Sequence, residues 1–175
     1  MRILHISSDY PYTSVYEQLL LHFSCETGQS HLMYVPLPNS RETPHTHARI
    51  SLNSELLHSN DYRNLERLLY WPKLTSISRR IEEQVSVRSI SAVHAHYLFS
   101  AGGVAFRMKQ HHGIPYVVAV RNTDISVFFR YALHLRHFGI RMLQDADRIV
   151  FISPSAQSHL MDRYIPRRLR DSIWN

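Results

Sequence analysis

Residues 91–120 read SAVHAHYLFSAGGVAFRMKQHHGIPYVVAV, and this stretch decides the fold. An apolar run, Ser91–Tyr97, is followed by a helix-like segment, Ser100–His112, and then by a second apolar run, Pro115–Val120. A strand, a helix and a strand in this order form the unit from which parallel sheets are built. YVVAV is apolar throughout, which is typical of a central strand that is buried on both faces.

The same alternation continues on both sides of this unit. Strands are expected at RILHIS and HLMYVPL, and RIVFI is expected to be a second central strand. Between Pro38 and about Asn60, prolines and serines indicate a long surface excursion with a short strand near Ile50. These elements predict one α/β domain over residues 1–175, with a Rossmann-like open parallel sheet and helices on both faces. Helices are expected at Val15–Gly28, at Tyr62–Leu69 and Leu74–Val85 with a break at Trp71–Pro72, at Phe128–Asp145, and from Pro154.

The basic side chains are nearly all arginines. The formal net charge is +6 at pH 7, and Lys73 and Lys109 are the only lysines among twenty basic residues. Arginine binds phosphate and carboxylate through a planar fork, so this bias favours anionic ligands. A genome rich in G and C gives the same bias without a functional cause. Sequence motifs for nucleic-acid binding are absent, and no nucleic-acid partner is expected.

The sequence is typical of a soluble cytoplasmic protein. The N-terminal apolar run is too short for the core of a signal peptide. No stretch approaches the roughly 18 to 20 apolar residues that cross a bilayer. Cys25 is the single cysteine, which excludes an internal disulfide, and its apolar surroundings predict that it is buried.

Polar residues follow several of the expected strands at their carboxyl ends, where ligands bind in open α/β sheets. His94 and His96 lie two residues apart and therefore on one face of their strand. The same rule collects Ser8 after the first strand, Arg121–Asp124 after YVVAV and Ser153 after RIVFI. Distant parts of the chain thus place polar groups along one edge of the sheet.

Three explanations of the two histidines stay open: a ligand crevice, a hydrogen-bonded structural pair, and a metal site. Two imidazoles on one strand face can chelate zinc, but a catalytic zinc site needs a third protein ligand. The available third ligands are His45, His47 and the pair His111–His112, and the di-zinc pattern H-x-H-x-D-H is absent. No metal site is therefore expected.

Glycine fingerprints for nucleotides are absent. The turn after the first strand, SSDYPYTS, has no glycine, and neither G-x-G-x-x-G nor G-x-x-x-x-G-K occurs. Gly102 and Gly103 lie near the start of a helix, where free N–H groups and the helix dipole favour an anion. Close packing of the helix on its neighbours explains the same glycine pair.

A basic stripe is expected on the helix that begins near Phe128. At about 100° per residue, Arg130, His134, His137 and Arg141 fall on one side, and apolar residues cover the other. This stripe is either a solvated face or a surface for anionic lipid headgroups or a lipid-linked phosphate.

The segments HAHYLFSAGGVAFRMKQHHGIPYVVAVRNTD and DADRIVFISPSAQ, taken together, resemble a known family. The chain resembles the N-terminal half of a retaining glycosyltransferase of the two-Rossmann-domain (GT-B) type, in family 4 (glycosyl transferases group 1). The likeness is best from about Ser91 to Pro166. It implies that this domain forms the acceptor side of a cleft, and that a second domain, absent from this chain, holds most of the nucleotide-sugar donor.

The resemblance further implies a role in bacterial surface polysaccharide or glycolipid synthesis, with a glycan or lipid-linked acceptor, no cofactor and no divalent metal. It implies a cytoplasmic location, with at most a peripheral contact at the inner face of the membrane, and no activity without the second domain. Two features depart from the family: Ser8–Thr13 has no glycine pair, and Arg121–Asn122 replaces a histidine with glycine. The catalytic candidates are His96, Arg121 and Asp124, and the substrate-binding candidates are His94, Asn122, Ser8, Ser153, Gly102 and Gly103.

Two other functions stay open from the residues alone. The first is a stand-alone flavodoxin-like domain that binds a ligand or a partner, for which no second domain is needed. The second is a zinc-dependent hydrolase that uses His94 and His96, which the zinc content of the purified protein tests directly.

Overall fold

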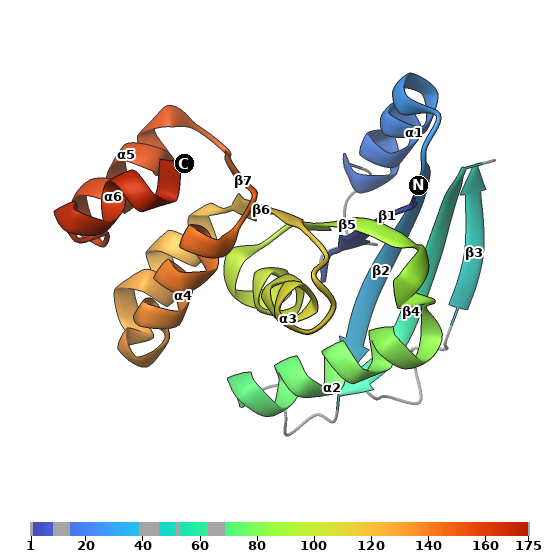
Figure 1. Cartoon of the computed structure of the whole chain (residues 1–175), viewed down its shortest axis with the longest axis horizontal. Coiled ribbons are helices and arrows are strands. Elements are labelled where there is room, and N and C mark those ends of the chain that lie inside the picture. The colour runs from blue at the N-terminus through green and yellow to red at the C-terminus, as the bar shows by residue number, and fades with distance from the viewer. Residues whose placement is uncertain (1, 9–14, 39–45, 52, 63–68, 175) are drawn as a thin grey trace.

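Strands and helices alternate along most of the chain, and the seven strands of the described residues form one sheet (Figure 1). The computed structural model describes residues 2–8, 15–38, 46–51, 53–62 and 69–174. The strand order is β3-β4-β2-β1-β5-β6-β7. The strands are β1 (Arg2–Ile6), β2 (Ser30–Pro38), β3 (Thr46–Ser51), β4 (Ser54–Tyr62), β5 (Ile90–Ala95), β6 (Tyr116–Val120) and β7 (Arg148–Phe151). The helices are α1 (Val15–Thr27), α2 (Tyr70–Gln84), α3 (Gly103–His112), α4 (Leu133–Asp145), α5 (Pro154–Arg163) and α6 (Arg167–Trp174).

The strands from β4 to β7 in this order all run parallel, which confirms the predicted Rossmann-like α/β sheet. The edge strand β3 is antiparallel to β4 and adds a seventh strand beside the six parallel ones. A connection as short as that between Ser51 and Ser54 joins antiparallel neighbours, because a parallel return needs a crossover of about a dozen residues or more.

The described part of the segment between Pro38 and Asn60 is mostly strand, so the predicted long surface excursion is wrong. β3 confirms the short strand expected there, and β4 pairs in parallel with β2. Within β4 the side chains of Leu56 and Leu57 are 8% and 7% exposed. The other residues of β4 are largely polar, so the segment lacks the apolar periodicity that predicts a strand.

Helices cover both faces of the sheet, as predicted. α1 packs on one face, where Tyr16 and Leu20 contact Met33 of β2 in a small apolar cluster. α2, α3 and α4 pack on the other face over the main core, to which β1 contributes Leu4 and β6 contributes Val118. In Figure 1, α1 accordingly lies on one side of the strands, with α2 and α3 on the other.

The predicted break at Trp71–Pro72 is absent. α2 begins at Tyr70 and runs through Pro72, because a proline in the first turn replaces an N–H that has no partner within the helix. The helix expected before this break included Tyr62, which instead ends β4. Residues 63–68 of that expected helix lie outside the described residues.

The single helix expected over Phe128–Asp145 is divided in two. A π-helical turn, Asp124–Phe129, precedes α4, and the backbone leaves helical geometry at Ala132, with φ −88° and ψ 67°. The last helix expected from Pro154 is also two helices, α5 and α6. The break at Ala132 changes the directions of the side chains before and after it.

The two apolar runs expected to be central strands differ in the structure. β6 is central, with Tyr116, Val118 and Val120 all 0% exposed. β7 is an edge strand, and Val150 and Ile152 on and beside it are 48% and 46% exposed, so that prediction is wrong. An apolar run does not reveal whether a second strand covers its far side.

Two other sequence features also have an outcome in the structure. Cys25 is exposed, contrary to the prediction, because α1 buries other positions such as Leu20 against the sheet. Among the described residues, the helices are too short or too polar to cross a bilayer.

A buried carboxyl group lies near the end of β4. Asp61 is 5% exposed, and its Oδ1 accepts a hydrogen bond of 2.6 Å from the Tyr34 hydroxyl. Burial raises the pKa of Asp61 to about 7, against the opposing effects of its hydrogen bonds and of Arg80. In an unfolded chain the pKa of aspartate is about 3.9. Between about pH 4 and pH 7, Asp61 therefore keeps its proton in the folded domain, whereas the unfolded chain has released it.

We expect the substitution Asp61→Asn to remove a pH dependence of folding. Because the folded state binds the proton more tightly, this group lowers wild-type stability by about 1.4 kcal/mol per pH unit as the pH rises from about 4 to about 7. The variant does not titrate at this position. Its unfolding free energy, relative to wild type, should therefore rise over this range and then level off, as measured by urea unfolding at successive pH values. A difference that does not depend on pH would contradict the assignment.

Candidate functional site

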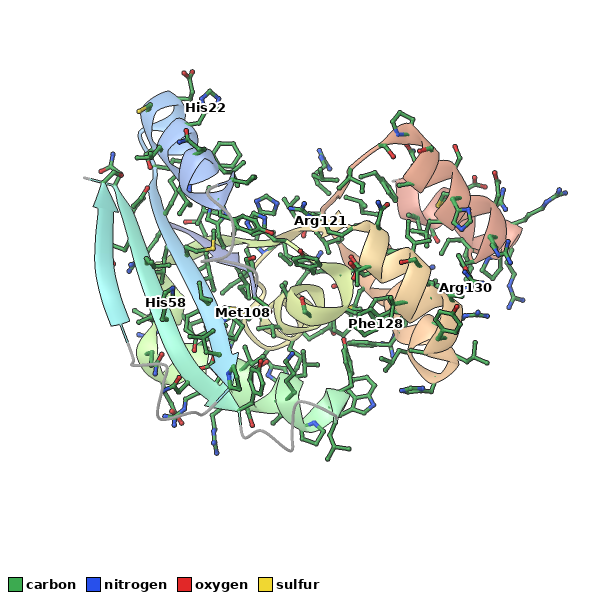
Figure 2. All side chains as sticks on the ribbon, turned by 180° about the vertical axis from the view of Figure 1, so that it is seen from behind. His22, His58, Met108, Arg121, Phe128 and Arg130 are labelled. Carbon is green, nitrogen blue, oxygen red and sulfur yellow. The ribbon has the colours of Figure 1, made fainter. Side chains whose placement is uncertain are left out.

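Polar residues gather at the carboxyl ends of β1, β5, β6 and β7, which share one edge of the sheet. They form two groups, with Arg121 beside the first and Asn122 in the second. The first group is a cluster of histidines, and the second lines a cavity that contains Arg130. Figure 2 labels Arg121 and Arg130, the basic residues associated with the two groups.

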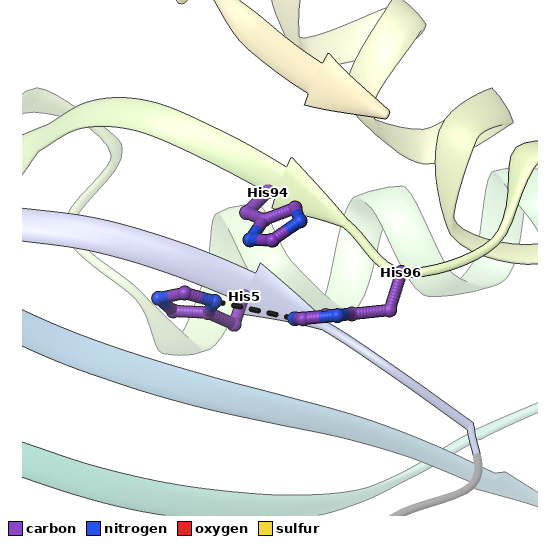
Figure 3. A group of neighbouring side chains, drawn as sticks. All are labelled: His5, His94 and His96. Carbon is purple, nitrogen blue, oxygen red and sulfur yellow. Dashed lines mark hydrogen bonds between the residues drawn. The ribbon is translucent and has the colours of Figure 1, made fainter. Parts of the chain in front are cut away.

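The first group, here called the histidine cluster, consists of His5, His94 and His96 (Figure 3). His5 of β1 pairs in register with His94 of β5, so both side chains leave the sheet on one face. His5 Nδ1 and His96 Nε2 are 3.2 Å apart, and the ring centroids of His94 and His96 are 4.1 Å apart. His5 was not predicted from the sequence, because the pairing between β1 and β5 leaves no local pattern.

Burial keeps the histidine cluster neutral. His5 and His96 are 1% and 2% exposed, whereas His94 is half-buried. Burial is the largest cause of a lowered pKa in all three residues, and it brings the pKa of His94 to about 4. The charge of Arg121 also lowers the pKa values of His94 and His96. At neutral pH these rings are therefore hydrogen-bonding groups without charge.

α1 covers the histidine cluster. Tyr16 makes an edge contact with the His96 ring, at 4.8 Å between centroids, and Phe23 stacks on His5 at 6.2 Å. A fourth histidine, His31 of β2, extends the contacts, because its Nδ1 lies 3.0 Å from His5 Nε2. Of the cluster, His94 is the member that reaches solvent.

Arg121 is half-buried at the end of β6, beside the histidine cluster. Its Nε donates to the His96 carbonyl oxygen at 3.3 Å, and its Nη2 donates to the Tyr16 hydroxyl at 3.4 Å. The guanidinium also lies over the Tyr97 ring, 5.5 Å from its centroid. These contacts hold a positive charge at the edge of the sheet, next to Asn122, which lines the cavity of the second group.

Asp124 joins the turns after β5 and β6. Its Oδ2 accepts from the backbone N–H of Leu98 at 3.1 Å and of Arg121 at 2.9 Å, and its Oδ1 accepts from that of Phe99 at 3.1 Å. The residue is 1% exposed. Burial raises the pKa of Asp124, and these three N–H groups and the Arg121 charge oppose the shift. The geometry gives Asp124 a positioning role in place of the predicted catalytic contact.

The second group lines a cavity of about 520 Å³, here called the basic cavity. It brings together three residues that the sequence predicted separately: Asn122, Arg130 and Ser153. Ser153 caps α5, since its Oγ accepts from the backbone N–H of Ala156 at 3.1 Å. None of the described residues that line the cavity is acidic. The cavity therefore combines positive charge with the N-terminus of a helix, and both favour an anion.

Three further residues line the basic cavity: Ser155, His159 and Arg163. They lie four residues apart along α5, and this spacing places them on one side of a helix. The positive charge of Arg163 was evident from the sequence, whereas Ser155 and His159 were not predicted. Arg163 of α5 adds a second guanidinium to that of Arg130, which follows the π-helical turn Asp124–Phe129.

The glycine pair does not belong to either group. The N–H of Gly102 donates to the Tyr97 carbonyl at 2.7 Å. A Cβ on Gly103 would lie 2.8 Å from both Leu74 Cδ1 and the Tyr70 hydroxyl. Gly103 thus lets α2 pack closely on α3, whereas Gly102 makes room for the Tyr97 carbonyl and Val118. The substrate-binding role of the pair stays a prediction. Ser8 lies just beyond the end of β1 and is not among the residues that line the basic cavity.

The predicted basic stripe is not continuous, because the helix breaks at Ala132. Arg130 lines the basic cavity, whereas His134 lines a separate cavity of about 260 Å³ between α2 and α4. Arg141 lies over an aromatic ring of α3, and His137 is exposed on α4. A single stripe of four basic residues is therefore wrong.

The histidine that the structure places beside His94 and His96 is none of the third metal ligands considered from the sequence. His111 and His112 lie at the end of α3, which packs on the sheet face opposite α1. His45 lies outside the described residues, and the side chain of His47 does as well. The structure brings His5 to His94 and His96 instead, with one ring nitrogen of each within 4.8 Å of the others.

Residues 22–171 match the family model of the glycosyl transferase 4-like domain. The chain belongs to this family. Its fold is that of the N-terminal Rossmann-like domain of family-4 glycosyltransferases with the GT-B architecture, which confirms the resemblance drawn from the sequence. No curated protein sequence matches the chain.

Solved structures show the same fold. The glycosyl transferase 4-like chain is similar to sucrose-phosphate synthase from Thermosynechococcus elongatus, with a TM-score of 0.75 and 13% identity, over 94% of this chain and 45% of that one. A second structure of that synthase has a TM-score of 0.68 and 14% identity, over 95% of this chain and 84% of that one. A trehalose-6-phosphate protein from E. coli, bound with UDP-2-fluoro glucose, has a TM-score of 0.59 and 12% identity, over 93% of this chain and 42% of that one. Identities this low establish the fold alone.

We expect Asp124→Asn to destabilise the domain by about 3 kcal/mol. An amide replaces one of the two oxygens, so buried N–H groups in both turns lose their acceptor and face another donor. Urea unfolding of the purified chain measures the loss. The matched control is Asp162→Asn, because Asp162 forms an exposed ion pair with Arg170 at 3.0 Å and such pairs contribute about 0 to 1 kcal/mol. Equal effects of the two substitutions would contradict the role of Asp124.

Proposed function

We propose that this domain forms the acceptor side of a retaining glycosyltransferase. The enzyme transfers a sugar from a nucleotide-sugar donor to a glycan or lipid-linked acceptor, in bacterial surface polysaccharide or glycolipid synthesis. Membership of the glycosyl transferase 4-like family supports the class of reaction. The basic cavity is the observation that carries the proposal, because it lies at the sheet edge where open α/β sheets bind ligands.

The basic cavity suits an acceptor that bears a phosphate. Arg130 and Arg163 supply two guanidinium groups, and Ser153 marks the N-terminus of α5. Asn122 and the Ser155 hydroxyl add uncharged groups that suit sugar hydroxyls. A phosphate in the cavity would gain charge-assisted hydrogen bonds without meeting an acidic side chain from the described lining residues.

Arg121 is proposed to contact the donor. Transfer develops negative charge on the leaving diphosphate, and a positioned cationic donor stabilises that charge. Arg121 holds its guanidinium at the edge beside the basic cavity, and Asp124 positions its backbone. His94, the more exposed imidazole, is the better placed of the two predicted histidines to bind a sugar hydroxyl, because His96 is 2% exposed.

The second domain of the GT-B architecture would hold most of the donor. This chain spans 45% of one neighbouring structure and 42% of another. The residues of the two groups therefore supply one side of a cleft, and we propose that the chain alone does not turn over.

A contact with the inner face of the membrane fits a lipid-linked acceptor. Leu69, Trp71, Tyr131 and Leu133 are 56%, 49%, 67% and 63% exposed, at the starts of α2 and α4. The Trp71 ring lies 4.8 Å from that of Phe138, which holds the two helices together. Exposed aromatic and aliphatic side chains with basic neighbours are typical of surfaces that bind anionic lipid. This surface, rather than the predicted stripe, is the proposed membrane contact.

Calorimetric titration of this chain tests the acceptor site with three probes: a hexose phosphate, the same hexose without phosphate, and polyprenyl phosphate in neutral-lipid vesicles. We expect binding that requires the phosphate, because the cavity lining is basic. Binding of the hexose phosphate alone indicates a soluble acceptor, and binding of the polyprenyl phosphate alone indicates a lipid-linked one.

Arg130→Ala and Arg163→Ala should each weaken this binding about tenfold or more, since each removes a charged hydrogen-bond donor. The matched control is Arg79→Ala, because Arg79 is exposed on α2 and pairs with Glu83 at 3.6 Å. The proposal fails if no probe binds, if the hexose binds as well as its phosphate, or if the control weakens binding as much as the two cavity variants.

A further inference from the structure

The proposed transfer uses one member of the histidine cluster, His94, and gives no role to the grouping of the three imidazoles. His5 and His94 are opposite one another on neighbouring strands, and His96 follows the last residue of β5 (Figure 3). One nitrogen of each ring lies within 4.8 Å of the others. Because two paired strands carry these side chains, the backbone of the sheet holds the cluster together.

The spacing of the nitrogens fits a metal ion. In a tetrahedral zinc site the Zn–N bonds are about 2.0–2.1 Å, so two ligand nitrogens are about 3.3–3.4 Å apart. His5 Nδ1 and His96 Nε2 are 3.2 Å apart, which is close to this separation. A ring nitrogen of His94 has to approach by at most about 1.5 Å to complete the same face of a tetrahedron.

We propose that His5, His94 and His96 bind a divalent transition-metal ion of the zinc class. Three imidazoles fill three of its four positions, and the fourth is left for water or an anion. This inference goes beyond the proposed transferase, in which no step needs a metal ion.

The three imidazoles are in the form that binds metal. An imidazole of ordinary pKa, about 6.5, is mostly neutral at neutral pH, so the rings can bind the ion without first losing a proton. The donors are nitrogens alone, which suit zinc, cobalt and nickel better than magnesium or calcium. The half-buried His94 gives the ion a path from solvent.

His31 provides the outer contact that metal-bound histidines usually have. Its Nδ1 lies 3.0 Å from His5 Nε2, and its side chain is 1% exposed. A histidine that binds metal through one nitrogen donates its other N–H to a neighbouring acceptor, which sets its tautomer and orientation. With Nδ1 of His5 on the ion, Nε2–H would donate to His31 in the geometry already present.

Arg121 opposes the ion. It is close enough to lower the pKa values of His94 and His96, and the same positive charge repels a bound cation. We therefore expect weaker binding than in structural zinc sites built with thiolates. An anion in the fourth position would lie between the ion and the guanidinium and would reduce this repulsion.

Titration of the chelator-treated, metal-free chain with Zn²⁺ tests the proposal. We expect one high-affinity Zn²⁺ per chain, and with Co²⁺ the strong visible absorption of a tetrahedral site. His94→Gln and His5→Phe should each weaken Zn²⁺ binding tenfold or more and abolish the Co²⁺ absorption. His31→Phe should weaken binding about tenfold through loss of the outer hydrogen bond.

The matched control is His111→Gln, on the opposite side of the sheet, because a chain with thirteen histidines needs a control for non-specific metal binding. It should bind as wild type does. If circular dichroism shows that His5→Phe is unfolded, His94→Gln decides, since its side chain is half-buried. The proposal is wrong if the wild-type chain does not bind Zn²⁺ in a one-to-one complex. It is also wrong if His94→Gln binds Zn²⁺ as tightly as the His111→Gln control. Neither result bears on phosphate binding in the basic cavity.

Discussion

The carboxylate of Asp124 accepts hydrogen bonds from three backbone N–H groups, two in the turn after β5 and one at the end of β6. Parallel strands place their carboxyl ends on one edge, but the turns beyond them have no ladder of their own. A buried anion with three donors supplies the missing connection between these turns. The positions of Arg121 and Asn122, at the start of the turn after β6, depend on this contact.

The two groups on this edge have opposite electrostatic characters. Burial keeps the histidine cluster neutral beneath α1, whereas the basic cavity exposes charged guanidinium groups next to a helix N-terminus. Arg121 lies beside the first and adjoins the second, held by the His96 carbonyl and the Tyr16 hydroxyl. A substrate with phosphate groups would therefore meet positive charge along the edge, while the neutral nitrogens beneath α1 suit a different ligand, a metal ion.

Local patterns predicted the parts of the molecule that depend on local sequence. β6 and the strand that carries His94 are apolar, and both were found, whereas β4 is polar in composition and was missed. The edge position of β7 depends on a neighbour that is absent among the described strands, so no pattern within RIVFI could reveal it. The same limit applies to the site. His5 lies beside His94 through pairing of strands far apart in the chain, but His159 and Arg163 follow Ser155 at a helical spacing that was readable.

Amide hydrogen exchange at Leu98, Phe99 and Arg121 is the most direct test of the role given to Asp124. In the wild-type chain we expect all three amides to be protected, because each donates to the same buried carboxylate. In Asp124→Asn, which keeps one of the two oxygens, exchange of the amides that lose their acceptor should accelerate, and by more than that of the amides of β2. Rapid exchange of the three amides in the wild type, or protection that survives the substitution, would contradict the account.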